Sequence, residues 1–360
     1  MKKFARNIVK WQQTHGRHDL PWQNIRDPYR IWISEVMLQQ TQVSAAIGYF
    51  ERFMRRFPNV ASLASASIDE VMPYWAGLGY YARARNIHKS AIIISENFEG
   101  NFPRQYDSVL ALPGVGRSTA AAICAFAYGA PMPILDGNVK RVFARFFGVA
   151  GDIRSKTIEI AMWRIAEREA PRKNIEAYIQ GQMDIGATVC TPNAPKCAIC
   201  PLQNGCIAHL ENRTHQLPER IPKKTRPHRQ IQMLVLRSAN NVLIERRPPT
   251  GIWGGLWSLP EAAIKNDVVA MANSLFAVSP TKGQLPTAQT PVEHGFTHYT
   301  LTIFPIQLMV DSRPHSVAEA GQKWISLEDI EGIALPAPVK SILLRLRHQP
   351  SVSCAPTTRG

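Results

Sequence analysis

Hydrophobic residues recur at helical spacing through the first 210 residues of the chain. The densest stretch, residues 29–53, contains no proline, and its apolar residues crowd its start, which predicts a buried helix. The same kind of pattern predicts further helices at Ile68–Tyr74, Ala82–Asn97, Ser118–Tyr128, Gly137–Phe147, Ser155–Glu169 and Ala177–Ile185. No alternating strand pattern occurs before residue 230, so this part of the chain is expected to be all-helical.

The pattern changes after residue 230. Two short apolar runs, Ile231–Arg237 and Val242–Arg246, flank Asn240 and Asn241, which predicts a β-hairpin. Residues 297–304 alternate again, and residues 339–347 have the pattern of an amphipathic helix. The second part of the chain is therefore expected to be α+β.

These changes predict a multidomain protein. We expect an all-helical domain over residues 1–212, a basic linker over 213–230, an α+β domain over 231–347 and a flexible tail over 348–360. Pro218, Pro222 and Pro227 prevent regular structure in the linker.

Charge gives the first indication of function. The chain of 360 residues carries a formal net charge of +15. Residues 1–212 contribute +8, residues 213–230 contribute +5 and residues 231–360 contribute +2. A basic excess on one domain and its linker is typical of a protein that binds nucleic acid. The sequence shows neither a run of eighteen apolar residues nor the apolar core of a signal peptide, so a soluble intracellular protein is expected.

Four of the six cysteines lie close together, as Cys190-x6-Cys197-x2-Cys200-x5-Cys206. Disulfides are disfavoured inside cells, so four close cysteines predict a metal centre. A zinc ribbon usually has two separated C-x2-C pairs. One pair with a single cysteine on either side favours an iron–sulfur cubane over zinc.

A glycine-containing turn joins two predicted helices at Leu112-Pro113-Gly114-Val115-Gly116-Arg117-Ser118-Thr119. Gly114 and Gly116 permit positive φ angles and leave backbone N–H groups unshielded at a helix start, where a DNA phosphate can bind. An ordinary turn between helices is the alternative. Together with the cysteine spacing, this segment resembles endonuclease III and its helix-hairpin-helix relatives among the DNA glycosylases. The resemblance implies one [4Fe-4S] cluster held by the four cysteines.

Two carboxylates are candidates for chemistry on a glycosidic bond. Glu35 lies among apolar residues, where loss of hydration would raise its pKa and make it a general acid, although helical spacing also permits a solvent-exposed position. Asp136 precedes a predicted helix, so it is expected to be an N-cap, and an ionised, rigid carboxylate there can stabilise an oxocarbenium-like centre.

Three segments make a closer resemblance. Residues 32–42 (WISEVMLQQTQ), 77–86 (GLGYYARARN) and 135–141 (LDGNVKR) are similar to the MutY adenine DNA glycosylases. This family removes adenine mispaired with 8-oxoguanine or guanine in double-stranded DNA. The resemblance implies that Glu35 protonates adenine N7 and later helps to activate water. It implies that Asp136 stabilises the sugar cation or bonds to it, with Asn138 and Ser118 in supporting roles.

The same resemblance implies contacts with the duplex. Gln40 and Tyr80 are expected to wedge into it, and Lys140, Gly114 and Gly116 are expected to bind DNA. The expected protein is a monomer of the cytoplasm that associates with the nucleoid and with no membrane.

Ser118 separates two branches of the superfamily. Endonuclease III-type lyases carry a nucleophilic lysine two residues after the second hairpin glycine, where this chain has Ser118. Because serine cannot form a Schiff base, a monofunctional glycosylase that leaves an intact abasic site is expected. Lys140 lies near Asp136 in the sequence and could react adventitiously with the abasic aldehyde.

The second domain resembles the MutY C-terminal domain, which is similar to Nudix hydrolases, in residues 248–260 (PPTGIWGGLWSLP). The sequence that follows lacks the Glu pair that would bind magnesium around a phosphate, so recognition is expected in place of hydrolysis. Phe296-Thr297-His298 matches the family's Phe-Ser-His loop, which implies inspection of 8-oxoguanine, with threonine in place of serine.

Three other functions are compatible with part of the sequence. An endonuclease III-like enzyme for oxidised pyrimidines would not explain Ser118 or the second domain. A DNA-binding iron–sulfur protein without catalysis would leave Glu35 and Asp136 without a role. A zinc-containing transcription factor would account for the cysteines alone.

Overall fold

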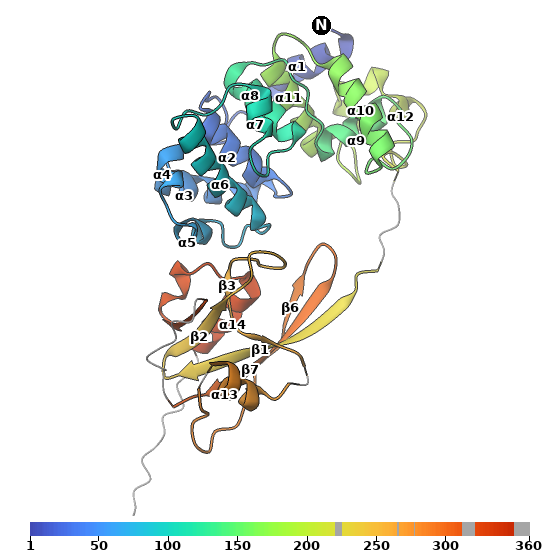
Figure 1. Cartoon of the computed structure of the whole chain (residues 1–360). Helices are drawn as coiled ribbons and strands as arrows, with labels where there is room; N and C mark the ends of the chain where they lie inside the picture. The colour runs from blue at the N-terminus through green and yellow to red at the C-terminus, as the bar shows by residue number, and fades with distance from the viewer. Residues whose placement is uncertain (220–224, 265, 277, 312–320, 349–360) are drawn as a thin grey trace, which may run out of the picture. The chain divides into compact units, whose positions relative to one another are not determined.

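A computed structural model describes residues 1–219, 225–264, 266–276, 278–311 and 321–348 of the chain (Figure 1). The chain divides into two compact units. The helical unit comprises residues 1–67 and 85–223, and the sheet unit comprises residues 68–84 and 224–360. None of the described helices is long and apolar enough to cross a membrane.

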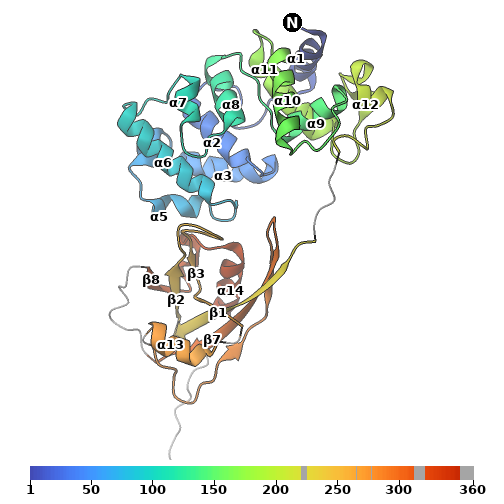
Figure 2. The same ribbon diagram turned by 45° about the vertical axis from the view of Figure 1, so that its right-hand side comes forward.

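The helical unit consists of helices joined by short turns (Figures 1 and 2). Its main helices are α1 (Lys3–His15), α2 (Pro28–Leu38), α3 (Val43–Arg56), α4 (Val60–Ala64), α6 (Ala82–Asn97), α7 (Tyr106–Leu110), α8 (Arg117–Tyr128), α9 (Gly137–Phe146), α10 (Lys156–Glu169) and α11 (Ile175–Asp184). Single turns of helix follow: η2 (Ile185–Val189), η3 (Cys197–Ile199), η4 (Gln203–Gly205) and α12 (Ile207–Leu210).

The long helix expected over residues 29–53 is wrong, because the structure has two helices there. Asp27 caps the start of α2 by accepting hydrogen bonds from the backbone N–H groups of Tyr29 and Arg30. The chain leaves α2 after Leu38, and Gln40 takes a left-handed conformation with φ +57° before α3 begins. Four polar residues, 39–42, interrupt the apolar pattern at this break, but no glycine or proline marks it in the sequence.

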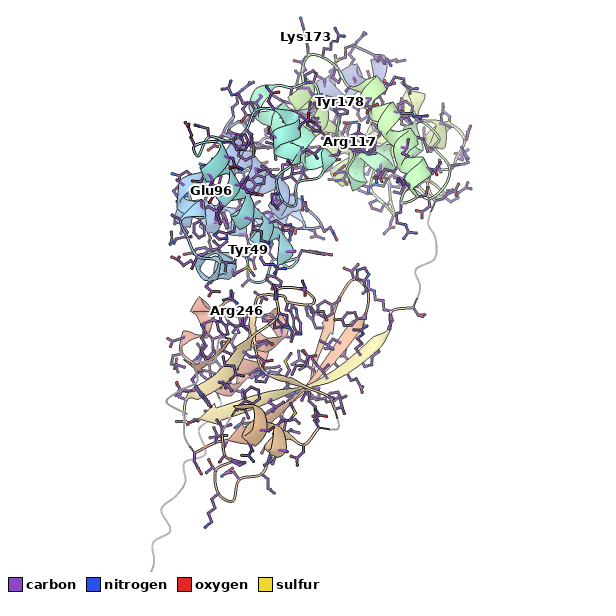
Figure 3. All side chains as sticks on the ribbon, in the orientation of Figure 1. Tyr49, Glu96, Arg117, Lys173, Tyr178 and Arg246 are labelled. Carbon is purple, nitrogen blue, oxygen red and sulfur yellow. The ribbon has the colours of Figure 1, made fainter. Side chains whose placement is uncertain are left out.

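Aromatic side chains fill two cores in the helical unit. In the first, Phe4 of α1 packs edge-on against Phe143 of α9, and Tyr178 of α11, labelled in Figure 3, is buried beside them. In the second, Trp32 of α2 and Phe50 and Phe53 of α3 are fully buried. Burial of a large aromatic side chain contributes about 1.5–3 kcal/mol to folding, so these cores hold the helices in fixed positions.

The sheet unit is built on one mixed sheet. Its strands are β1 (His228–Ser238), β2 (Asn241–Arg246), β3 (Trp257–Ser258), β4 (Glu261–Ala262), β5 (Thr287–Ala288), β6 (Val292–Gly295), β7 (Thr300–Met309) and β8 (Gln322–Ser326). Its helical segments are α5 (Ile68–Val71), η1 (Met72–Tyr74), α13 (Val268–Phe276), η5 (Asp329–Gly332) and α14 (Ala337–Arg347). In both views α13 and α14 lie on opposite sides of the sheet (Figures 1 and 2).

The predicted hairpin is present, and β1 is longer than expected. Strands β1 and β2 pair antiparallel, with Ser238 opposite Asn241. Strand β1 also pairs in parallel with β7 from His228 opposite Thr300 onward, so it begins inside the segment expected to be a linker. Pairing with a strand so distant in sequence cannot be deduced from local pattern. Pro222 and residues 349–360 of the expected tail lie outside the described residues.

Candidate active site and DNA-binding elements

A cavity of about 580 Å³ opens within the helical unit. Its wall comes from the segment between α1 and α2, from α2 itself, from the start of α9 and from α11. Glu35, Asp136 and Asn138 all line it. The structure therefore brings together the two carboxylates that the sequence left a hundred residues apart.

Glu35 occupies the third turn of α2. Its neighbours Ser34 and Val36 are buried, and Glu35 itself is half-buried and lines the cavity. Burial, followed by the negative charge of Asp136, raises the pKa of Glu35 from 4.5 to about 7. The solvent-exposed alternative for Glu35 is therefore wrong, and the side chain can carry a proton near neutral pH.

Asp136 is the N-cap of α9, as the sequence predicts. Its carboxylate accepts hydrogen bonds from the Val139 backbone N–H at 2.8 Å and from the Asn138 amide at 3.2 Å. Burial raises the pKa of Asp136, while these hydrogen bonds and the charge of Arg141 act in the opposite direction. The hydrogen bonds fix the orientation of the carboxylate and favour its charged form.

Arg141 and Gly186 also contact Asn138 and hold it in place. Its Oδ1 accepts a hydrogen bond from Arg141 Nη2 at 2.8 Å, and Arg141 also donates to the carbonyl oxygens of Gly186 and Cys190. A Cβ at Gly186 would lie 2.5 Å from the Asn138 Cβ, so only glycine fits there. Sequence reasoning missed Arg141 as a positioning residue, because its role depends on carbonyl groups that are distant in the chain.

Ser118 lies in the first turn of α8 and accepts a hydrogen bond from the Leu135 backbone N–H at 3.0 Å. Gln39, at the end of α2, donates to Thr119 Oγ1 at 3.2 Å. The start of α8 therefore contacts both segments that carry the carboxylates. Ser118 positions the residue before Asp136, and it is not among the residues lining the cavity.

Lys140 is also outside the cavity lining. Its ammonium group lies 2.6 Å from Glu159 Oε1 of α10, and its side chain is 18% exposed. The sequence placed Lys140 near Asp136, but the helical geometry of α9 directs it to α10.

The predicted helix-hairpin-helix consists of α7, the turn at residues 111–116 and α8. Gly114 has φ +77°, and a Cβ there would lie 2.7 Å from Asn86 Nδ2 of α6. Gly116 differs from the expectation: its φ is −93°, it is the N-cap of α8, and a Cβ there would meet open space. Of these two glycines, Gly114 alone needs the left-handed conformation. The N–H groups of the first turn of α8 remain available to an anion.

Gln40 and Tyr80 share an unusual backbone conformation. Both are non-glycine residues with positive φ, +57° for Gln40 and +52° for Tyr80. Gly77 and Gly79, also with positive φ, precede Tyr80, whose side chain is 46% exposed. Such strained positions gather at functional sites, where the surrounding structure holds them.

Phe296, Thr297 and His298 lie in the turn between β6 and β7, not in a strand. Thr297 and His298 are exposed, and the Thr297 hydroxyl lies 3.1 Å from the Tyr80 hydroxyl within the sheet unit. Phe296 contacts the rings of Trp253 and His294, with centroids 5.4 and 4.6 Å apart. The structure therefore joins Tyr80, which is expected to wedge into the duplex, to Thr297, which is expected to inspect 8-oxoguanine.

The longer helices of the sheet unit, α13 and α14, contain no Asp or Glu. Acidic residues occur in its short helical segments, Asp69 and Glu70 in α5 and Asp329 and Glu331 in η5.

The four cysteines line one small cavity after α11. Burial raises the pKa of Cys200 to about 11, the Leu202 backbone N–H opposes this rise, and Cys190, Cys206 and Cys197 add to it. Within the described ranges, no three His, Cys, Asp or Glu side chains are arranged to hold a metal ion. The donor set, four thiols around one space, fits the soft-ligand chemistry of an iron–sulfur cluster.

One buried ion pair at the cavity was missed from the sequence. Arg17, which lines the cavity, bonds Asp184 with its guanidinium at 2.6 Å and with its backbone N–H at 2.9 Å. Gln180 donates to the same carboxylate at 2.9 Å. Asp184 is 1% exposed, so it holds the segment after α1 against α11. The sequence offered no signal for this pair, because 167 residues separate its members.

Comparison with known proteins agrees with this geometry. Residues 33–168 match the family described as HhH-GPD superfamily base excision DNA repair protein, and residues 232–345 match the NUDIX domain. A solved structure of a thermostable thymine-DNA glycosylase is 28% identical, with a TM-score of 0.53 over 58% of this chain and 95% of that one. The fold and the paired carboxylates thus define a helix-hairpin-helix DNA glycosylase with a Nudix-like second domain.

Relatives that match over most of this chain make the family assignment more specific. The adenine DNA glycosylase of Buchnera aphidicola subsp. Acyrthosiphon pisum (strain APS) is 39% identical over 343 residues, which cover 94% of this chain and 96% of the relative. The Mus musculus adenine DNA glycosylase is 31% identical over 94% of this chain and 77% of its own. The chain belongs to the adenine DNA glycosylase family.

Proposed function

We propose that this protein removes adenine paired with 8-oxoguanine or guanine in double-stranded DNA and leaves an intact abasic site. The observation that carries the proposal is the pair Glu35 and Asp136 in one cavity, with burial and Asp136 raising the pKa of Glu35 to about 7. A duplex hides its bases in the stack, so the adenine must be extruded to enter the cavity.

The two carboxylates take different roles. Glu35 in its protonated form donates its proton to adenine N7, and the C1′–N9 bond breaks with its electron pair moving to the base. Asp136 in its ionised form stabilises the cationic sugar. Glu35, now a carboxylate, accepts a proton from the water that adds to C1′. Base release thus consumes one water and restores both side chains.

Strand cleavage is not part of this proposal. A lyase needs an amine that attacks C1′, but Ser118 stands at the lysine position and its hydroxyl accepts a hydrogen bond from Leu135 N–H. Lys140, the other amine in the neighbourhood, is bound by Glu159.

The proposal includes one [4Fe-4S] cluster, whose ligands are Cys190, Cys197, Cys200 and Cys206. The support for it is that the four cysteines line one cavity, as a shared centre requires. When bound, the cluster would fix the fold of the cysteine loop; the base chemistry needs no electron from it.

The remaining proposed roles concern the duplex. The hairpin N–H groups near Gly114 and Gly116 and the charge of Lys140 bind phosphates, and Gln40 and Tyr80 enter the base stack. Phe296, Thr297 and His298 inspect the oxidised guanine. The protein acts as a monomer on DNA, in the cytoplasm and at the nucleoid.

A single-turnover assay tests the proposal. A labelled duplex with one central A·8-oxoguanine pair is incubated with excess protein, and each sample is divided into an alkali-treated and an untreated half. We expect cleavage in the alkali-treated half only. Cleavage in both halves would overturn the monofunctional assignment, and cleavage in neither half would overturn the adenine substrate.

Two variants test the residue roles in that assay. Glu35→Gln keeps the shape of the side chain but cannot exchange the proton, and Asp136→Asn keeps an acceptor for the Val139 N–H but removes the charge. Each is expected to lower the rate of base release at least 100-fold, as general acid catalysis and charge stabilisation contribute about that much. Near-normal release by either variant would remove that residue from the mechanism.

A further inference from the structure

Arg145, in the last turn of α9, is an almost fully buried cation. It is 2% exposed. Its guanidinium donates to the carbonyl oxygens of Leu217 at 2.8 Å, Thr191 at 2.7 Å and Pro192 at 3.1 Å, and to Cys190 Sγ at 3.3 Å. Its own backbone carbonyl accepts from Cys206 Sγ at 3.4 Å.

These contacts place Arg145 at the junction of three segments. Its side chain joins α9 to the start of the cysteine loop and to the residue that precedes Pro218. The side chain also lines the small cavity formed by the four cysteines. The planar fork of the guanidinium makes this possible, because its donors point in several fixed directions.

The charge of Arg145 needs compensation. The half-buried Arg17 pairs with the carboxylate of Asp184, whereas the partners of Arg145 in the described part of the chain are neutral carbonyls and one sulfur atom. A buried charge without a counter-charge costs several kcal/mol. Thiolates at the cysteine positions would supply that counter-charge, and a metal–thiolate centre keeps them deprotonated.

We propose that Arg145 is the counter-ion of the four-cysteine centre, and that it determines how firmly the centre is held and at what potential it accepts an electron. This inference rests on the proposed iron–sulfur cluster. A hydrogen bond and a positive charge at a cysteine sulfur favour the more negative, reduced state of a cluster, so they raise its reduction potential. Arg145 is thus a positioning residue that acts on the centre and not on the base.

The experiment compares the full-length wild-type protein with Arg145→Gln, Arg145→Lys and the control Arg154→Gln. Arg154 forms an exposed ion pair with Asp152 in the loop after α9, so its loss removes an equal charge without touching the cysteines. Iron and sulfide per chain, the rate of cluster loss in the presence of a chelator, and the reduction potential are measured for each.

We expect Arg145→Gln to lose its cluster at least fivefold faster than wild type and to have a lower reduction potential. Arg145→Lys keeps the charge but not the planar fork of donors, so its rate of cluster loss and its reduction potential should lie between those of wild type and Arg145→Gln. Arg154→Gln should have the same rate and potential as wild type. A merely structural role would leave the potential of the remaining cluster unchanged, and that result would overturn the inference.

The outcomes also separate this inference from the proposed cofactor. Absence of iron and sulfide from the wild-type protein would overturn the cluster itself. A wild-type cluster together with unaltered loss rate and potential in Arg145→Gln would overturn the role of Arg145 alone. If Arg145→Gln does not fold, Arg145→Lys decides, since unaltered values in that variant would overturn the role of the guanidinium.

Discussion

Glu35 and Asp136 line the same cavity, and the charge of Asp136 adds to burial in raising the pKa of Glu35 to about 7. Burial raises the pKa of both carboxyl groups. At Asp136 the hydrogen bonds from Val139 and Asn138 oppose this rise and favour the anion, whereas at Glu35 the negative charge of Asp136 adds to it. A pair of carboxyls with opposite environments is the arrangement that glycosidic hydrolysis requires.

The rate of base release should therefore fall as the pH rises through about 7. In the proposed mechanism the acid form of Glu35 is the active one, and it is lost as the pH exceeds its pKa of about 7. Single-turnover rates measured between pH 5 and 9 should show this alkaline limb. A rate that stays constant from pH 6 to 9 would contradict the role of Glu35 as the acid.

Glu35→Gln should also stabilise the protein at alkaline pH. The folded pKa of about 7 exceeds the unfolded value of 4.5, so the folded state binds more protons between these values and its stability falls as the pH rises through them. The loss is at most about 3 kcal/mol, and less because water reaches the cavity. At pH 8 the unfolding temperature of Glu35→Gln should exceed that of wild type by a few degrees, roughly 2–4 °C per kcal/mol.

The pH dependence supplies the control for this stability effect. At pH 4 the side chain is neutral in both proteins, and the two unfolding temperatures should converge. A difference that is the same at pH 4 and pH 8 would indicate altered packing and contradict ionisation as the cause.

Glu159→Gln should increase covalent trapping of the abasic product by borohydride. The change releases Lys140, whose ammonium now lies 2.6 Å from Glu159, and a released amine is available to react with the aldehyde of the abasic sugar. We expect a several-fold increase in the trapped protein–DNA species on a denaturing gel. The double variant Glu159→Gln, Lys140→Ala should not show this increase in the trapped species.

Glu167→Gln is the matched control for this experiment. It removes the same negative charge from α10 and releases Arg117, labelled in Figure 3, which provides no nucleophilic amine. Its trapping should equal that of wild type. Equal increases in both variants would show that general charge, and not Lys140, is responsible.

Tyr80→Phe should weaken discrimination between 8-oxoguanine and guanine opposite adenine. The phenyl ring remains for stacking, but the 3.1 Å contact between the Tyr80 and Thr297 hydroxyls is lost. A neutral hydrogen bond contributes about 0.5–1.5 kcal/mol, so the ratio of the two binding affinities should fall by about 2–10-fold. Titration of the two duplexes at one salt concentration measures the ratio.

Tyr49→Phe, which removes a hydroxyl from α3 in the helical unit, serves as the control. Its ratio of binding affinities for the 8-oxoguanine and guanine duplexes should equal that of wild type. An unchanged ratio in Tyr80→Phe would show that the Tyr80–Thr297 contact takes no part in discrimination.

The sequence by itself determined the helical character of the first part, the cysteine set, the N-cap at Asp136 and the turn before α8. These features depend on residues within one or two helical turns, where periodicity, capping and glycine conformation act locally. The α+β character of the second part was likewise visible in its strand pattern, and its Nudix-like character was indicated by the resemblance in residues 248–260.

Only the tertiary structure decided the environment of Glu35, because burial and the approach of Asp136 come from helices that are distant in sequence. The same holds for the break at Gln40, where a left-handed conformation occurs in a segment that contains no glycine or proline. It holds for the parallel pairing of β1 with β7, for Lys140 with Glu159, and for Arg145 at the cysteines. Contacts between residues that are distant in sequence determine the electrostatic environment, the burial and the orientation of these side chains. The pattern of residues along the chain does not show which distant groups will be in contact.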